Sequence, residues 1–321
     1  MPVATAVAHP NIALVKYWGK RDRALNLPAV PSLSVTLDGF ATTTTVRWGA
    51  GADRVEVDGR LLEGAEAGRV LRFLDLVDPA RPPVEVHSRS NFPAAAGLAS
   101  SASAFAALAL AATAAAGQQP SPQALSVLAR RGSGSACRSL WGGFVVWRRG
   151  ERADGLDSHG EPLAPEGHWD LRIVVAVISE GRKAVGSTEG MVRTEQTSPL
   201  FPAFVQAADD RLERARRAVL DRDLPALGEQ MERSTYEMHA TMISAWPPVR
   251  YWRPGTLATL QAVDELRAAG TLAYCTMDAG PNVKVLCRAE DAAAVAAAVA
   301  PHAARVEVLR VGGAPTVAVE P

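Results

Sequence analysis

The chain has 321 residues, and 48% of them are hydrophobic, so it is long enough for two domains with cores of their own. Basic and acidic residues both number 34, and this balance gives no support for binding to nucleic acid or to an anionic membrane surface. Three cysteines without a Cys-x-x-Cys pair, and no signal-like or long apolar segment, predict a soluble cytoplasmic protein.

The first sixty residues predict mostly sheet. Residues 3–8 and 33–48 alternate as strands do, and a third strand at 53–57 ends at Asp58-Gly59, a hairpin signal. Between the first two strands, Lys16, Lys20 and Arg21 lie beside Tyr17 and Trp18. This cationic, aromatic segment is either a binding element or a solvated loop whose aromatic rings pack on the core.

Residues 65–77 predict an amphipathic helix with Arg69 and Arg72 outward, and 84–88 predict a strand. Residues 91–103 then form a Gly/Ser loop that leads into an alanine-rich helix ending near Gly117. Serine hydroxyls and free backbone N–H groups at the start of a helix favour phosphate binding. The alternative is a simple serine cap, and no Gly-Lys-Ser/Thr closes the loop as in a Walker A motif.

A second small-residue turn follows a helix that begins at Ser121. Residues 132–139 carry Arg138 and precede a strand predicted at 140–147, so we expect an ordered site here, although a flexible linker has a similar composition. Residues 150–169 predict a surface excursion, and 171–178 predict a fully buried strand. We place a domain boundary near residue 170.

The second half predicts helices segregated against antiparallel strands, which is an α+β arrangement. A loop is expected at 183–198, helices at 200–219, 223–243, 255–269 and 290–300, and strands at 272–277, 282–287, 305–310 and 315–319. The hairpin turn contains Asp278, which by itself is better explained as a turn residue than as a catalytic one. The six histidines show no zinc-binding spacing, and no Gly-x-Ser-x-Gly surrounds Ser135.

Only four of the 34 basic residues are lysines, namely Lys16, Lys20, Lys183 and Lys284. The excess of arginine is attributed to genome composition, but it makes the positions that remain lysine notable.

Five motifs together resemble the mevalonate diphosphate decarboxylases of the GHMP kinase superfamily. They are Asn11 to Asp22, Leu25 to Pro28, Asn91 to Ser101, Gly132 to Ser139 and Met277 to Asn282, in unchanged order between about residues 5 and 287. The resemblance implies a two-domain GHMP fold. Residues 1–170 would be the ATP-binding domain, with a mixed sheet and the phosphate loop, and 171–321 an α+β, ferredoxin-like domain carrying the catalytic aspartate.

The resemblance also implies the reaction: ATP-dependent decarboxylation of (R)-5-diphosphomevalonate to isopentenyl diphosphate, with Mg2+ as metal cofactor. Asp278 would assist transfer of the γ-phosphoryl group to the tertiary hydroxyl. Arg138 would hold the substrate carboxylate as a planar donor, and Lys16 would orient the hydroxyl and keep Asp278 ionised.

Other positions carried over from the resemblance belong to binding. The substrate diphosphate is expected against Tyr17, Trp18, Gly19, Lys20, Ser133, Gly134, Ser135, Ala136, Cys137 and Thr188, with Arg69 or Arg72. The ATP phosphates are expected at Ala96, Gly97, Leu98, Ala99, Ser100, Ser101 and Ser103, with Ser101 as a possible Mg2+ ligand. A homodimer is also implied.

Two alternatives remain at this point. A related GHMP enzyme phosphorylates mevalonate or its monophosphate without decarboxylation, and a catalytically silent ligand sensor uses the same fold. In some family members an arginine on the 183–198 stretch contacts a phosphate, and Arg193 beside Glu195 leaves that equivalence open.

Overall fold

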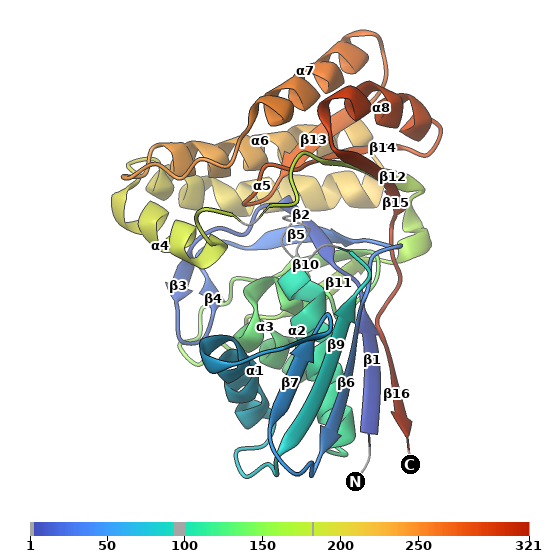
Figure 1. The fold of residues 1–321 in the computed structure, drawn as a ribbon. Helices are drawn as coiled ribbons and strands as arrows, with labels where there is room; N and C mark the ends of the chain where they lie inside the picture. The colour runs from blue at the N-terminus through green and yellow to red at the C-terminus, as the bar shows by residue number, and fades with distance from the viewer. Residues whose placement is uncertain (1–2, 93–99, 182, 321) are drawn as a thin grey trace.

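Three β-sheets and the helices that cover them contain most of residues 3–92, 100–181 and 183–320, which are the residues that the computed structural model describes. Figure 1 shows one body built on a long sheet and a second body of helices above it. Within the described residues, no helix is both long and apolar enough to span a membrane.

The first sheet has six strands in the order β16-β1-β6-β9-β7-β8. Its strands are β1 (Val3–Ala8), β6 (Thr42–Trp48), β7 (Arg54–Val57), β8 (Arg60–Leu61), β9 (Val84–Ser90) and β16 (Thr316–Glu320). Neighbours are antiparallel except β7 and β9. The β7–β8 hairpin turns at Asp58 and Gly59, which have φ angles of 50° and 78°, as the Asp-Gly signal predicts.

Three helices cover one face of this sheet: α1 (Gly64–Val77), α2 (Ser100–Ala115) and α3 (Pro122–Gly132). The small alanine side chains of α2 let it lie deep in the core, where Ala106, Ala107 and Ala109 are fully buried. Ser121 caps α3, since its side chain accepts a hydrogen bond from the backbone N–H of Ala124.

A second sheet has the order β11-β10-β5-β2, from β2 (Asn11–Val15), β5 (Ser32–Thr36), β10 (Phe144–Trp147) and β11 (Gly160–Ala164). The short hairpin of β3 (Lys20–Asp22) and β4 (Leu27–Pro28) extends from it, and the 3-10 helix η1 (Gly134–Arg138) precedes β10. A further 3-10 turn is η2 (Glu166–His168). This sheet packs on the long helices α5 (Phe201–Asp221) and α6 (Leu224–Ile243).

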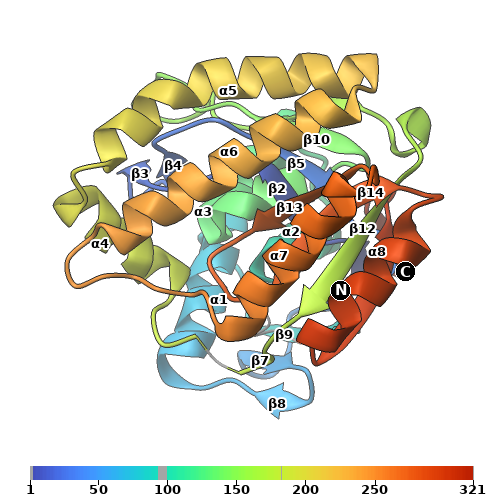
Figure 2. The same ribbon diagram turned by 90° about the horizontal axis from the view of Figure 1, so that it is seen from above.

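The third sheet has the order β13-β14-β12-β15 and is entirely antiparallel. Its strands are β12 (Leu171–Val177), β13 (Ala273–Met277), β14 (Val283–Arg288) and β15 (Arg305–Arg310). Ile173 and Val175 face the core shared with α5 and α6, whereas Val174 faces α7 (Pro254–Ala268) and α8 (Ala292–Val299). A 3-10 turn, η3 (Ala300–His302), follows α8. Figure 2, seen from above, shows α5, α6, α7 and α8 covering the top of the molecule. The strand predicted at 171–178 is therefore buried on both faces, as expected.

The α+β class and most predicted elements are confirmed, with four corrections. The single strand predicted at 33–48 is two strands, β5 and β6, which belong to different sheets. The strand predicted at 140–147 begins only at Phe144, because Gly143 turns the chain with a φ of 71°. The excursion at 150–169 contains strand β11, which pairs with β10. The loop predicted at 183–198 contains helix α4 (Ser187–Thr197), whose buried residues are Gly190, Met191 and Thr194.

The strand predicted at 315–319 forms as β16, but it pairs with β1 in the sheet of the first half. Figure 1 shows it running down beside β1, with the two ends of the chain close together. The last residues of the second half thus return to the first.

Candidate active site

A cavity of about 1300 Å³ lies between the two bodies, and several separate stretches of the chain line it, including α1 and one residue of α6. The end of β2, the start of α2, η1, α4 and the turn after β13 all contribute. Cationic side chains dominate its wall: Lys16, Lys20, Arg23, Arg69, Arg72, Arg131, Arg138 and Lys183. Such a wall favours a ligand with several negative charges.

Lys16 follows β2 directly and is only 1% exposed. Its backbone N–H donates to the Ser234 hydroxyl on α6 at 2.9 Å, which fixes the residue across the two bodies. Its Nζ donates to Ala13 O at 2.8 Å and to Asp278 Oδ1 at 2.8 Å. Burial lowers the pKa of Lys16 to about 8, and the neighbouring Asp278 carboxylate opposes this shift.

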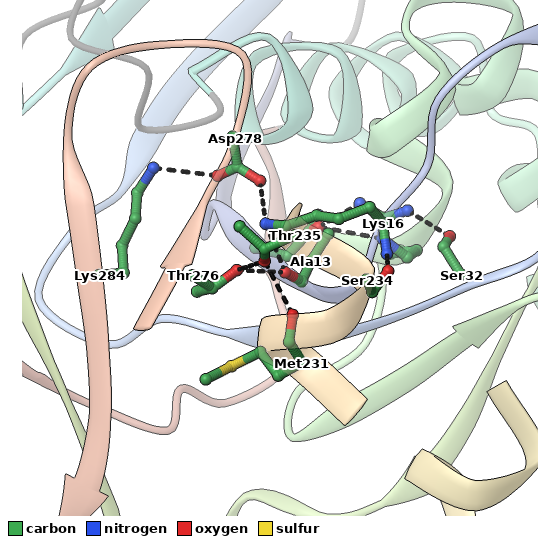
Figure 3. A network of polar contacts seen from close by, with 11 residues as sticks. Ala13, Lys16, Ser32, Met231, Ser234, Thr235, Thr276, Asp278 and Lys284 are labelled. Carbon is green, nitrogen blue, oxygen red and sulfur yellow. Dashed lines mark hydrogen bonds and ion pairs between the residues drawn. The ribbon is translucent and has the colours of Figure 1, made fainter. Parts of the chain in front are cut away.

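Asp278 lies in the tight turn between β13 and β14, with a quarter of its side chain exposed toward the cavity. The turn is held by its own Gly280 N–H to Asp278 O bond of 2.7 Å, and by Asn282 Oδ1, which accepts from the backbone of Ile178 and Ser179. Lys16 and Lys284 reach the two carboxylate oxygens from different sides (Figure 3). Burial alone raises the pKa of Asp278, but these two ammonium charges outweigh it and hold the pKa well below its usual range.

Arg138 is the last residue of η1 and is 2% exposed. Asn11 Oδ1 accepts from its Nε at 3.1 Å and from its Nη2 at 2.9 Å, and the Ser32 hydroxyl accepts from Nη1 at 2.6 Å. A guanidinium has five N–H donors. Since three are used within the described residues, two remain for a ligand in the cavity, and the planar group that presents them is rigidly held.

The predicted segment Tyr17–Lys20 lies at the same cavity, with Tyr17, Trp18 and Lys20 on its wall. The Tyr17 ring lies 4.6 Å from that of Trp147, and its buried hydroxyl has no hydrogen-bond partner among the described residues. Lys20 Nζ donates to Asn26 Oδ1 at 2.7 Å. Gly19 is not on the wall: it has a φ of 92°, and an added Cβ would lie 2.5 Å from the Phe201 ring.

The second small-residue turn also meets the cavity through Ser133, Gly134 and Ser135, and α4 contributes Thr188. A Cβ on Gly134 would lie 2.8 Å from the Tyr17 hydroxyl, so only glycine fits there. Arg69 and Arg72 both line the cavity. Arg69 is the more constrained, with Nη2 donating to Gly132 O at 2.8 Å.

Ser100 and Ser101, at the start of α2, line the cavity, and the Ser101 hydroxyl lies 3.1 Å from that of Ser133. The phosphate loop itself cannot be described, because Ala96, Gly97, Leu98 and Ala99 lie outside the described residues. Within those residues, no group of three or more His, Cys, Asp or Glu side chains is placed to hold a metal ion. Ser101 is therefore a candidate for one contact to a cation whose other ligands come from a nucleotide and water.

Three predicted contact residues have their side chains in the core instead. The Ser103 hydroxyl pairs with that of Thr42 at 2.7 Å, because helical periodicity directs it toward β6. Ala136 and Cys137 are fully buried, and burial raises the pKa of the Cys137 thiol to about 12, so this thiol stays neutral. Any contact of Ala136 or Cys137 with a ligand is limited to backbone groups.

Four site residues were not predicted from the sequence: Asn11, Lys183, Ser234 and Lys284. For Lys183 and Lys284 the sequence did carry a signal: the chain has only four lysines, and all four lie at this site. Lys16, Lys20 and Lys183 line the cavity, and Lys284 Nζ lies 3.0 Å from Asp278 Oδ2. In a chain with 30 arginines, the four ammonium groups mark one site. Asn11 and Ser234 gave no signal because their role comes from tertiary contacts.

Two family descriptions match this chain. Residues 8–160 match the diphosphomevalonate decarboxylase-like N-terminal domain, and residues 173–309 match the mevalonate 5-diphosphate decarboxylase C-terminal domain. The diphosphomevalonate decarboxylase of Aspergillus fumigatus is 40% identical over 317 residues, which cover 91% of this chain and 78% of that protein.

Solved structures agree over almost the whole chain. The mevalonate diphosphate decarboxylase of Staphylococcus aureus has a TM-score of 0.93 and 36% identity, covering 100% of this chain and 99% of that one. A structure described as MDDEF in complex with MVAPP, AMPPCP and magnesium has a TM-score of 0.91 and 39% identity, with 99% of both chains covered.

Proposed function

The chain belongs to the diphosphomevalonate decarboxylase family, with its GHMP-type α+β fold, and we infer from this membership that it catalyses the family reaction. It decarboxylates (R)-5-diphosphomevalonate with ATP, giving isopentenyl diphosphate, CO2, ADP and phosphate. Its cofactors are ATP and Mg2+, in keeping with the MVAPP, AMPPCP and magnesium bound together in a structure 39% identical. When bound, the nucleotide supplies the phosphoryl group and the metal neutralises phosphate charge.

One observation carries the assignment of roles: Lys16, Arg138 and Asp278, far apart in the sequence, face a single cationic cavity. We propose that the substrate's tertiary hydroxyl lies beside Asp278 Oδ1 and Lys16 Nζ. Its oxygen attacks the γ-phosphorus, the bond to ADP breaks, and its proton passes to the Asp278 carboxylate. Because phosphoryl transfer has a loose transition state, an acid with a depressed pKa is a sufficient acceptor.

Decarboxylation then breaks two bonds. The carbon–oxygen bond to the new phosphate breaks as phosphate leaves, the bond to the carboxylate carbon breaks as CO2 leaves, and the electron pair of the second bond becomes the double bond. The two N–H donors that Arg138 has left hold the carboxylate in line, and the Asp278 anion lies near the developing positive charge.

We propose that the substrate diphosphate is bound by Lys20, by Ser133 to Ser135 and by Arg69, all on the cavity wall. Ser100 and Ser101 contact the nucleotide phosphates, and Ser101 is the candidate protein contact for Mg2+. We further propose a cytoplasmic homodimer, with residues 1–170 as the ATP-binding part and 171–321 as the part that carries Asp278. Three buried free cysteines are compatible with a reducing compartment.

The test is incubation with ATP, Mg2+ and (R)-5-diphosphomevalonate, measuring ADP, CO2 and isopentenyl diphosphate. We expect all three in equal amounts, and Asp278→Asn to lose about 10³-fold or more in kcat while still binding an ATP analogue, since general-base and electrostatic contributions are lost together. ADP formed without CO2 identifies a kinase instead. Full turnover by Asp278→Asn removes Asp278 from the mechanism.

A further inference from the structure

Lys284 is a buried ammonium group that the reaction scheme above does not use. It lies on β14, where it pairs with Thr276 of β13 on one side and Val175 of β12 on the other, and it is 1% exposed. Its Nζ lies 3.0 Å from Asp278 Oδ2. Among the described residues, Lys284 is not part of the cavity wall, whereas Lys16 and Asp278 are. It therefore contacts the carboxylate without lining the cavity.

The two oxygens of Asp278 are divided between two lysines. Oδ1 accepts from Lys16 and Oδ2 contacts Lys284, as Figure 3 shows. A carboxylate attached through a single χ2 torsion has a broad rotational preference, so one partner alone leaves its plane poorly defined. Two ammonium groups on opposite oxygens define that plane. Of these two lysines, Lys16 is the one that lines the cavity, so Oδ1 is the oxygen bound to a cavity-lining ammonium group.

The Lys16 side of the arrangement is fixed independently. Lys16 is bound through its backbone to Ser234 and through Nζ to Ala13 O, and Thr276 Oγ1 shares the Ala13 carbonyl at 3.4 Å. Thr276 also pairs with Thr235 of α6 at 3.0 Å. With Lys16 held by these contacts, the contact of Lys284 with Oδ2 restricts rotation of the Asp278 carboxylate.

A lysine is costly at this position, so its presence needs a reason. A buried ammonium loses favourable hydration, and Lys16 already supplies one cation to Asp278. A second one makes the cluster of Lys16, Asp278 and Lys284 net positive, with Lys183 nearby as a further cation. A compact ammonium makes one point contact on one oxygen, whereas a guanidinium is broader and planar. This accounts for a lysine here in a chain that otherwise uses arginine.

We propose that Lys284 is a positioning residue for the decarboxylation: by holding Oδ2 it aims Oδ1 at Lys16 and at the reacting hydroxyl. This inference rests on the proposed function, because it assigns Asp278 a catalytic role. It predicts that Lys284 affects the chemical step rather than the binding of either substrate, since it does not border the cavity.

The experiment compares Lys284→Met, a neutral side chain of similar length, with wild type in the coupled ADP and CO2 assay. Loss of a charge-assisted contact to a buried carboxylate is expected to lower kcat about ten- to hundredfold, with KM for both substrates within about twofold. The matched control is Val285→Ala, the next residue on β14, fully buried and packed in the α7–α8 core. It is expected to lower Tm but to keep kcat.

Each outcome bears on the proposal. An unchanged kcat in Lys284→Met overturns it, and so does an equal loss in Val285→Ala, because kcat would then follow general loosening of the strand. If Lys284→Met does not fold, Lys284→Gln is judged by the same split between kcat and KM. Absence of CO2 from wild type would count against the proposed function itself, and is thereby separate from a failure of the role of Lys284.

Discussion

At the scale of single residues, the site depends on the ammonium group of Lys16, whose charged form is destabilised by burial. Lys16 is almost fully buried, and burial lowers its pKa from the usual 10.5 to about 8. Burial of this charge is unfavourable to folding, and the neighbouring Asp278 carboxylate offsets part of that cost. A group placed at such a cost is typical of a functional site.

The sign of the resulting pH dependence follows from proton binding. Between about pH 8 and 10.5 the unfolded chain keeps the Lys16 proton while the folded chain loses it. In this window the unfolded state binds more protons, so the contribution of Lys16 to the free energy of unfolding increases as pH rises. Activity changes in the opposite direction, because the protonated form is the one that orients Asp278.

We therefore expect kcat/KM to fall as pH rises above about 8, since this ratio reports ionisation in the free enzyme. In Lys16→Arg the guanidinium stays charged, so the decline above pH 8 should disappear, although the overall rate is lower. Lys183 also has a lowered pKa, caused first by burial, and Lys183→Arg is the matched control that should keep the decline. The measurement is a pH profile of CO2 release. A decline that persists in Lys16→Arg assigns it to another group.

At the scale of secondary-structure elements, α4 was the least predictable part of the site. Its sequence has glycine and several threonines, which favour a helix weakly. Tertiary contacts stabilise the helix instead. Gly190 packs closely on Trp18, since an added Cβ would lie 3.2 Å from that ring. Glu195 joins α4 to the β3–β4 hairpin by accepting from the Lys20 backbone N–H and from Arg23 at 3.2 Å.

Truncation of this carboxylate should affect substrate binding. In Glu195→Ala the Lys20 segment loses its contact to α4, and we expect KM for diphosphomevalonate to rise about tenfold, with KM for ATP unchanged. The matched control is Glu229→Ala, which removes an exposed helical pair with Arg233 and should leave both constants unchanged. Steady-state kinetics with each substrate varied in turn gives the answer. An equal effect on both KM values would contradict a local role for Glu195.

Sequence patterns were sufficient where a residue's role is local. The Asp58-Gly59 hairpin, the start of a helix at Ser121 and the turn around Asp278 were all predicted, because local backbone chemistry determines them. The meeting of Lys16 with Asp278 came from the family resemblance, and no spacing over 262 positions could give it. Lys284 and Asn11 were missed because strand register and packing, which are non-local, create their contacts.

At the scale of the whole molecule, one core serves both halves of the chain. Ile12, Leu33 and Phe144 from the first half pack in the same buried cluster as Leu171 and Leu227 from the second. The end of the chain adds a backbone connection, since Gly312 N donates to Thr36 O and Gly143 N donates to Gly312 O, both at 2.8 Å. The cavity lies between parts that are held together by this shared core.

The boundary proposed near residue 170 would therefore not separate two independently stable parts. We expect the full chain to unfold in urea in one transition, and fragments 1–170 and 171–321 to aggregate when expressed alone, because each exposes its side of the shared core. Co-expression of the two fragments should restore a soluble complex that releases CO2, since the covalent link at 170 lies outside the cavity wall. The readouts are tryptophan fluorescence during unfolding and the yield of soluble fragment. Two separate transitions, or a folded monomeric 1–170 fragment, would show that the first half is stable without helices α5 and α6.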